Sequence, residues 1–216
     1  VRIRYFATNN ANAYATGIDF KINGEFVKGV ESWFSMSVMK TMEDLVDDFY
    51  FVDINSNGEE IIYGYTENDI PVETVRKEPG YIPRPTDQRF NFSLFFQDYI
   101  PKLPSFKMNI SLHYATGLPF GPPQSRNRHE ATLRIPPYRR VDLGFSYHAK
   151  SDEKQLKGKN PLNTFNNIWV SLEVFNLLQI NNVISYIWIE DVTGRNYAVP
   201  NFLTSRQLNL KIHFDF

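Results

Sequence analysis

The sequence contains no cysteine among its 216 residues. This absence excludes a disulfide framework and a thiolate metal site. The 23 basic and 24 acidic side chains give a formal net charge of −1, and we find no Lys/Arg-rich run, Gly-rich phosphate loop or Walker pattern. Because the chain lacks the basic footprint of a nucleic-acid-binding protein, we expect no nucleic-acid partner.

Long apolar runs are also missing. No segment approaches the roughly 18 apolar residues of a transmembrane helix, which excludes a helical span. A strand of a membrane β-barrel needs only about ten residues, and only every second one is apolar. The sequence has no signal peptide at Val1, so an outer-membrane protein with this sequence would be either a mature form or a fragment, and of the two we expect a fragment.

Aromatic residues, by contrast, are abundant, with 18 Phe, 12 Tyr and 3 Trp. The last ten residues, QLNLKIHFDF, show the clearest pattern in the chain, an alternation of apolar and polar residues. The apolar positions are Leu208, Leu210, Ile212, Phe214 and Phe216. This period of two predicts a β-strand with one apolar face and one polar face.

The same alternation recurs along the chain and predicts an all-β protein of about eight antiparallel strands. The other clear segments are 89–97, 105–114, 140–148 and 168–174, and the less regular ones are 1–6, 14–22 and 30–39. Short turns are expected at 23–29 and 99–104, and long polar connections at 40–87, 117–137 and 178–206. Alternating short and long connections are typical of membrane barrels.

Two of the long connections are expected to contain hairpins of their own. One would pair 49–54 with 60–65 around Asn57-Gly58, a strong hairpin turn signal. The other would pair 184–190 with 197–199 around Thr193-Gly194.

A secreted β-sandwich would also alternate apolar and polar residues. Three features favour an antiparallel transmembrane β-barrel instead. The apolar faces carry no charge at mid-strand, where lipid would penalise it; the strands are near ten residues; and aromatics gather near strand ends. These aromatics are Tyr14, Phe26, Trp33, Tyr99, Tyr114, Tyr138, Tyr147, Phe214 and Phe216.

Five stretches resemble the C-terminal part of TonB-dependent outer-membrane receptors of the type common in Bacteroidetes. They are RPTDQRFNFSL (84–94), YATGLPFGPP (114–123), PPYRRVDLGFSYHAK (136–150), WVSLEVFNLLQINNVISYIW (169–188) and YAVPNFLTSRQLNLKIHFDF (197–216). Residues 1–83 resemble the family only in their strand pattern. The resemblance implies a 22-stranded barrel with an N-terminal plug, of which residues 1–216 would be the C-terminal portion of a single domain.

The resemblance also implies a function and a location. The protein would be a non-enzymatic receptor and transporter for a scarce nutrient such as an iron chelate, cobalamin or a glycan, with no cofactor of its own. It would lie in outer-membrane lipid with its C-terminus and short turns periplasmic and its long loops extracellular. TonB, acting through a plug that this sequence lacks, the barrel-assembly machinery and a surface lipoprotein are the partners implied.

Within this hypothesis the terminal strand carries the barrel-assembly signal, through Leu208, Leu210, Ile212, Phe214 and Phe216. An edge strand that pairs transiently by β-augmentation suits that role. The polar faces supply possible lumen or plug contacts at Arg140, Asp142, Glu173, Lys211 and His213, with further charges at Asp19, Lys21, Lys107 and Asp215. Arg140 and Asp142, two residues apart on one face, are the pair most suited to brace a plug.

Other motifs have simpler explanations. Residues 53–58 resemble the start of a calcium loop, but its twelfth position is Gly64 rather than Glu, and a hairpin turn accounts for the same residues. His129 and Glu130 lack a third metal ligand at a suitable spacing. Two competing functions stay open at this point. One is a barrel that acts as a scaffold or assembly partner without transport, and the other is a soluble secreted β-sandwich.

Overall fold

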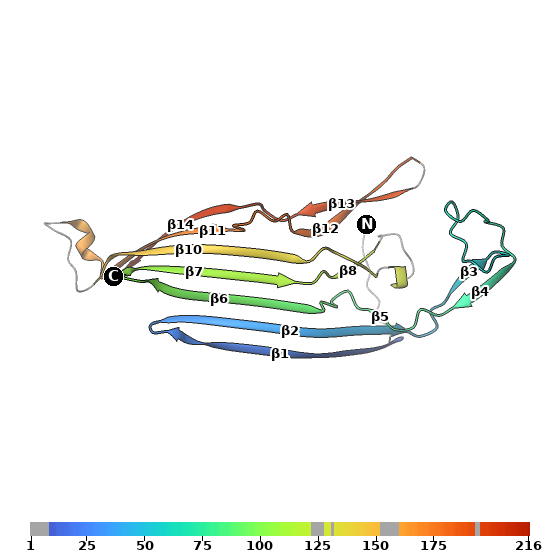
Figure 1. The fold of residues 1–216 in the computed structure, drawn as a ribbon, viewed down its shortest axis with the longest axis horizontal. Helices are drawn as coiled ribbons and strands as arrows, with labels where there is room; N and C mark the ends of the chain where they lie inside the picture. Colours follow the sequence, from blue (N-terminus) through green and yellow to red (C-terminus); the bar gives the residue numbers. More distant parts are fainter. Residues whose placement is uncertain (1–8, 122–127, 131, 152–159, 193–194) are drawn as a thin grey trace. The chain divides into compact units, whose positions relative to one another are not determined.

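The protein is all-β, with antiparallel strand pairing throughout. The structure, a computed structural model, describes residues 9–121, 128–130, 132–151, 160–192 and 195–216 (Figure 1). Within these ranges the only helical elements are two 3-10 turns, η1 (Arg128–Glu130) and η2 (Pro161–Thr164). No helix of the described part is long and apolar enough to cross a membrane.

The chain forms two compact units. One unit comprises residues 1–16, 40–87 and 119–133, and the other comprises residues 17–39, 88–118 and 134–216. The second unit contains most of a large sheet. The strand order is β1-β2-β6-β7-β10-β11-β14, and a short strand, β5, also pairs with β2. The bounds are β1 (Ala11–Val27), β2 (Val30–Leu45), β5 (Ile82–Pro83), β6 (Phe90–Ile100), β7 (Leu103–Ala115), β10 (Tyr138–Lys150), β11 (Asn167–Phe175) and β14 (Gln207–Asp215).

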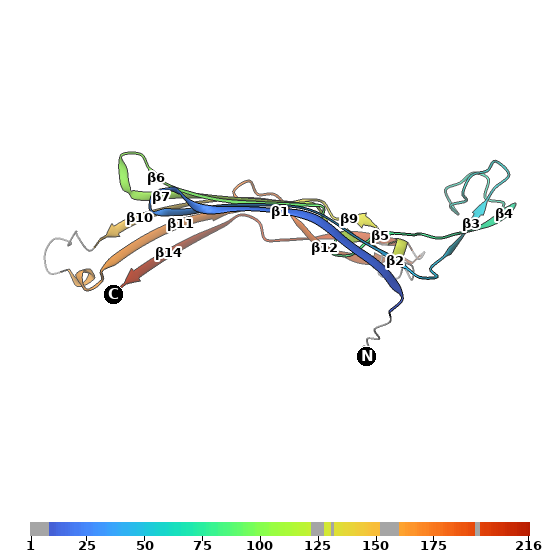
Figure 2. The same ribbon diagram turned by 90° about the horizontal axis from the view of Figure 1, so that it is seen from below.

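Cross-strand register places the apolar residues of the sheet on one face. In an antiparallel pair, directly opposed residues share a face. Leu172 of β11 lies opposite Phe145 on one side and Leu210 on the other, and Phe145 in turn lies opposite Met108. Figure 2 shows the central strands of this sheet as a single layer. One face of the layer is therefore apolar across β7, β10, β11 and β14, and it is interrupted at the end of β6, where Asp98 lies opposite Met108.

Five of the predicted strands match the structure closely, and two extend further than the sequence pattern indicated. β1 continues through Val27, so the expected turn at 23–29 shrinks to the residues around Gly29. Gly29 has φ 81°, a conformation that tight hairpin turns require and that glycine adopts at little cost. β2 continues to Leu45, well into the segment expected to be a loop. The predicted strand at 1–6 lies outside the described residues.

The sheet is open in the described residues. β1 and β14 are its two edges, each paired on one side only, and they do not close into a barrel. The described residues thus form an antiparallel sheet but no closed barrel, and the membrane barrel of which they were expected to be a part stays a prediction, because closure needs either pairing of β1 with β14 or further strands between them.

The second long-loop hairpin is confirmed. β12 (Val183–Glu190) pairs with β13 (Asn196–Phe202), although the expected turn at Thr193-Gly194 lies outside the described residues. Two short strands, β8 (Pro119–Phe120) and β9 (Leu133–Arg134), form another small sheet.

The pairing predicted around Asn57-Gly58 is wrong. β3 (Tyr50–Ile54) pairs with β4 (Glu73–Lys77), and residues 60–65 contribute only an isolated bridge between Glu60 and Ile54. The cause is the side chain of Asn55, which is almost fully buried. Its Oδ1 accepts hydrogen bonds from the amides of Asn57 and Glu59, both at 3.0 Å, and so closes a local turn instead of a two-stranded hairpin.

Candidate functional site

The polar face of the large sheet is the candidate functional site. Register places three of the predicted lumen contacts on it, because Arg140 lies opposite His113, Asp142 opposite Ser111, and Glu173 opposite both Gly144 and Asn209. Lys211 lies opposite Ser171, and His213 opposite Trp169, on the same face. The five residues singled out from the sequence therefore share one surface, opposite the apolar face.

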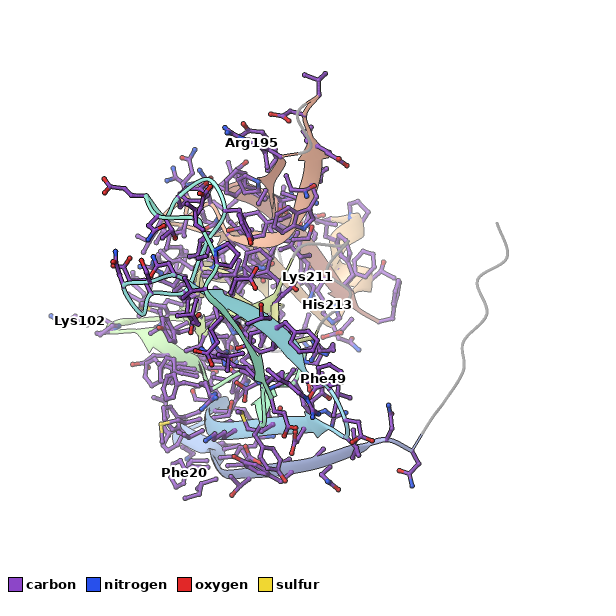
Figure 3. The ribbon with its side chains drawn as sticks, turned by 90° about the vertical axis from the view of Figure 1, so that its right-hand side faces the viewer. Phe20, Phe49, Lys102, Arg195, Lys211 and His213 are labelled. Carbon is purple, nitrogen blue, oxygen red and sulfur yellow. The ribbon has the colours of Figure 1, made fainter. Side chains whose placement is uncertain are left out.

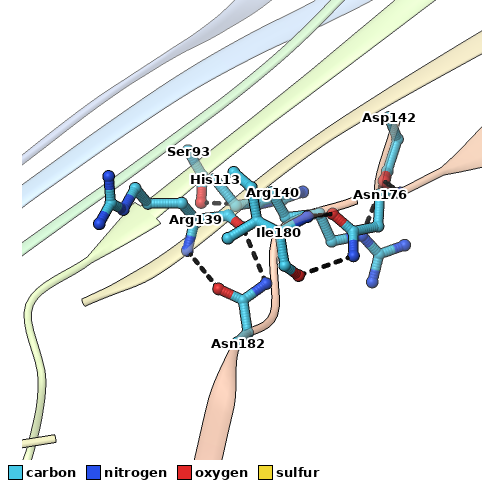
Figure 4. Close-up of polar contacts among 8 residues, drawn as sticks. All are labelled: Ser93, His113, Arg139, Arg140, Asp142, Asn176, Ile180 and Asn182. Carbon is cyan, nitrogen blue, oxygen red and sulfur yellow. Dashed lines mark hydrogen bonds and ion pairs between the residues drawn. The ribbon is translucent and has the colours of Figure 1, made fainter. Parts of the chain in front are cut away.

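Arg140 and Asp142 form an ion pair, with Arg140 Nε donating to Asp142 Oδ1 at 2.7 Å (Figure 4). The same carboxylate oxygen accepts the backbone amide of Asn176 at 2.8 Å. Asp142 is buried, and its negative charge is balanced by the neighbouring guanidinium. The structure thus shows this pair bonded to each other and to the segment after β11. Contact with a plug stays a prediction.

Two buried asparagines that the sequence reasoning missed fix this segment. The amide of Asn176 bonds the backbone of Ile180 twice, donating to the carbonyl at 2.9 Å and accepting the N–H at 3.0 Å. The amide of Asn182 bonds the backbone of Arg139 in the same way, with both bonds at 2.8 Å (Figure 4). Residues 176–182 are consequently pinned to the start of β10. We call these two contacts the asparagine clamps.

A small cavity of about 70 Å³ lies beside the clamps. Its lining includes Arg140, whose guanidinium lies 5.2 Å from the ring centroid of Phe175, and the clamp residues Asn176 and Asn182. Thr204 and Ser205 add hydroxyl groups. The cavity is polar and large enough for a few waters or one small polar group.

Phe95 and Trp169 are aromatic residues on the polar face of the sheet, and each contacts an aromatic or cationic side chain. Phe95 stacks on Trp33, with ring centroids 6.2 Å apart. Trp169 is stacked by the ring of His148 at 4.1 Å, and Lys107 Nζ lies 4.3 Å from its centroid. These contacts explain how large rings sit on a polar face, because each ring is covered by a stacking or cation–π neighbour.

Glu173, Lys211 and His213, the other three predicted lumen contacts, lie along β11 and β14. Asn209 Nδ2 donates to Glu173 at 2.9 Å, and His213 Nε2 lies 2.7 Å from Asp215. Lys211 and His213 lie on the same strand, two residues apart (Figure 3). Near the opposite edge, Asp19 accepts a hydrogen bond from the hydroxyl of Ser37.

The five residues of the predicted assembly signal lie on the exposed apolar side of the edge strand. Leu208 is 74% exposed and Leu210 is 65% exposed. Phe214 and Phe216 both contact the ring of Phe165, at centroid distances of 4.8 and 4.9 Å. Within the described part of the chain, β14 is paired along one edge, as an assembly signal that works by strand addition would require. The signal itself stays a prediction.

The calcium-like residues 53–58 serve a structural purpose. Asn55 uses its side-chain oxygen for two backbone amides, and Asp53 accepts hydroxyl hydrogen bonds from Thr74 and Tyr63, both at 2.7 Å. Among the described residues, no group of three or more His, Cys, Asp or Glu side chains is placed to hold a metal ion. His129 stacks instead on Tyr50 at 4.3 Å, within the first unit.

The hydrogen bonds from Thr74 and, second, from Tyr63 lower the pKa of Asp53 below its ordinary value. Their stabilising contribution is fully present above the ordinary Asp pKa of about 4, and it is lost as the pH falls through the lower pKa of the folded state. We therefore expect amide protection in β3 and β4 to fall at acidic pH, as measured by hydrogen exchange. Asp53→Asn should remove this acid dependence, whereas Asp69→Asn should retain it; equal behaviour of the two variants would contradict the assignment.

Comparison with protein families, curated proteins and solved structures found no match for this chain.

Proposed function

We propose that this chain is part of an outer-membrane β-barrel that serves as a TonB-dependent receptor and transporter for a scarce nutrient. The observation that carries the proposal is the exposed apolar face of the large sheet. That face includes Phe145, Leu172, Leu210 and Ile212, which are 42–65% exposed in the described structure. A soluble protein rarely exposes so large a contiguous apolar surface, whereas a bilayer covers one.

Two further features support the barrel. The opposite face is polar and carries charged residues, two of which, Arg140 and Asp142, pair with each other, as expected of a lumen wall. The edge strands β1 and β14 leave one side unpaired, which lipid tolerates only when further strands complete the sheet. In this proposal the C-terminus and the β6–β7 turn are periplasmic, and the β12–β13 hairpin is extracellular.

A nitroxide accessibility experiment separates the membrane barrel from a soluble sandwich. Residues 1–216 contain no cysteine, so Leu172→Cys and Ser171→Cys each give a single labelling site on β11 once any cysteine elsewhere in the full-length protein is replaced by serine. In reconstituted full-length protein, the label at 172 should collide more with lipid-soluble oxygen and the label at 171 more with an aqueous nickel chelate. A label at 172 that neither reagent reaches would indicate a face buried in protein, as in a sandwich.

Transport needs a separate test, because a barrel could act as a scaffold. Cells that produce the full-length chain should take up one of a panel of labelled iron chelates, cobalamin or oligosaccharides, and a protonophore or loss of TonB should abolish the uptake. Correct membrane insertion without energy-dependent uptake of any member of the panel would favour the scaffold.

A further inference from the structure

A second, larger pocket lies in the same unit, and its lining includes the end of β7 and the start of β12. Its volume is about 280 Å³. Ala115 is the last residue of β7, and Tyr138 is the first residue of the neighbouring strand β10. The walls of the pocket come from the connection after β7, the connection before β10, and the start and end of the β12–β13 hairpin. The lining residues are Gln88, Asn91, Ala115, Thr116, Gly117, Leu118, Ile135, Pro136, Tyr138, Val183, Ile184 and Leu203.

Both walls of this pocket are fixed by hydrogen bonds. On one side, the amide of Ile135 donates to the carbonyl of Leu118 at 3.1 Å, and Arg134 donates to the carbonyl of Gly117 at 3.0 Å. A Cβ on Gly117 would lie 1.5 Å from the carbonyl oxygen of Ile135, so only glycine permits this close approach.

On the other side, the clamp residue Asn182 bonds the backbone of Arg139, and its own carbonyl accepts the amide of Leu203 at 2.8 Å. The β12–β13 wall is therefore tied to the start of β10. A pocket whose walls are held before a ligand arrives loses little conformational entropy on binding.

The lining has a definite chemical character. Among the described residues its lining includes no charged side chain, and its apolar side chains Leu118, Ile184 and Leu203 are 38–55% exposed. The few polar groups are already engaged in part, since Asn91 donates to Gln88 at 3.2 Å and Gln88 donates to the carbonyl of Thr116 at 3.3 Å. Such a pocket favours an apolar ligand with few hydrogen-bonding groups and penalises a charged one.

The size of the pocket limits the ligand further. An apolar protein cavity of about 150 Å³ accommodates benzene. The pocket is open to the surface rather than enclosed, and its volume of about 280 Å³ has room for a group of about two fused rings. The smaller polar cavity shares Tyr138 and Leu203 with this pocket. The guanidinium of Arg140 in that cavity is already paired with Asp142, so the cavity offers a ligand hydroxyl and amide contacts without a net charge.

We propose that the 280 Å³ pocket binds the ring-containing, uncharged end of a small amphipathic ligand, whose hydroxyl- or amide-bearing end reaches the smaller cavity. All the residues involved belong to one compact unit. The proposal goes beyond the transport function and does not depend on it, because the pocket would bind such a ligand in a scaffold protein as well.

The test uses 2-naphthol, which has two fused rings and one hydroxyl, with the full-length chain in nanodiscs. Equilibrium dialysis against empty nanodiscs separates saturable binding from partition into lipid.

Ile184→Trp fills the pocket and should weaken binding of 2-naphthol at least tenfold. Ile187→Trp is a matched control on the same hairpin, because Ile187 is 57% exposed, compared with 55% for Ile184, and does not line the pocket; it should change the affinity less than twofold.

A second probe tests the charge requirement. Naphthalene-2-carboxylate has a similar ring system but carries a negative charge, and it should bind at least tenfold more weakly than 2-naphthol. Equal effects of the two tryptophan variants, equal affinity for the two probes, or the absence of any saturable binding would each overturn the proposal.

Discussion

Leu210→Arg is expected to prevent stable insertion of the protein into the outer membrane. Leu210 lies at the middle of β14 on the apolar face, opposite Leu172, and 65% of it is exposed. A cation on the lipid face near the bilayer midplane costs about 2–4 kcal/mol. That is a large fraction of the net stability of a typical fold. The measurement is the amount of heat-modifiable, folded protein in outer-membrane fractions of cells that produce the full-length chain.

Lys211→Leu is the matched control for this prediction. Lys211 is the next residue on the same strand and lies on the polar face, opposite Ser171. Its replacement removes a charge but places nothing costly in lipid, so assembly should stay near the wild-type level. Similar losses for both variants would contradict the assignment of the apolar face to lipid, and normal assembly of Leu210→Arg would refute it outright.

Asn182→Ala is expected to detach the start of the β12–β13 hairpin from β10. Asn182 is 5% exposed and satisfies both the N–H and the carbonyl of Arg139. Leaving two such backbone groups unsatisfied costs about 2–6 kcal/mol in total. We expect the exchange rate of the Arg139 amide to rise at least tenfold in hydrogen-exchange measurements, and binding of 2-naphthol to weaken with it.

The adjacent Asn181 provides the control. It has the same side chain but is exposed, so Asn181→Ala should change stability by less than about 0.5 kcal/mol and leave the Arg139 amide protected. If the two alanine variants give equal protection at Arg139, the asparagine clamp does not fix this segment.

The sequence was informative wherever a repeating pattern determined the outcome. The alternation in segments such as 105–114 and 207–216 predicted both the strands and their faces, because successive side chains of a strand point to opposite sides. It therefore also grouped Arg140, Asp142 and Glu173 on one surface before any pairing was known. The alternation alone did not separate a membrane barrel from a sandwich, since both cover one face of each strand; the charge-free mid-strands, the strand lengths and the aromatic residues near strand ends favoured the barrel.

Single side chains with unusual roles were not predictable. Asn57-Gly58 indicated a hairpin turn between two neighbouring strands. Instead, the buried side chain of Asn55 accepts hydrogen bonds from the backbone N–H groups of Asn57 and Glu59, and β3 pairs with the more distant β4. Asn176 and Asn182 gave no signal at all, because an asparagine that bonds a distant backbone looks like any loop asparagine in a sequence.

The sequence by itself thus determined an all-β chain whose strands have one apolar and one polar face. Local residue order is sufficient for this, because the period of two is a property of every strand. Only the tertiary structure decided the strand order, the register that aligns Leu172 with Leu210, and the pocket between the connections. These features depend on contacts between residues far apart in the chain, which no local pattern encodes.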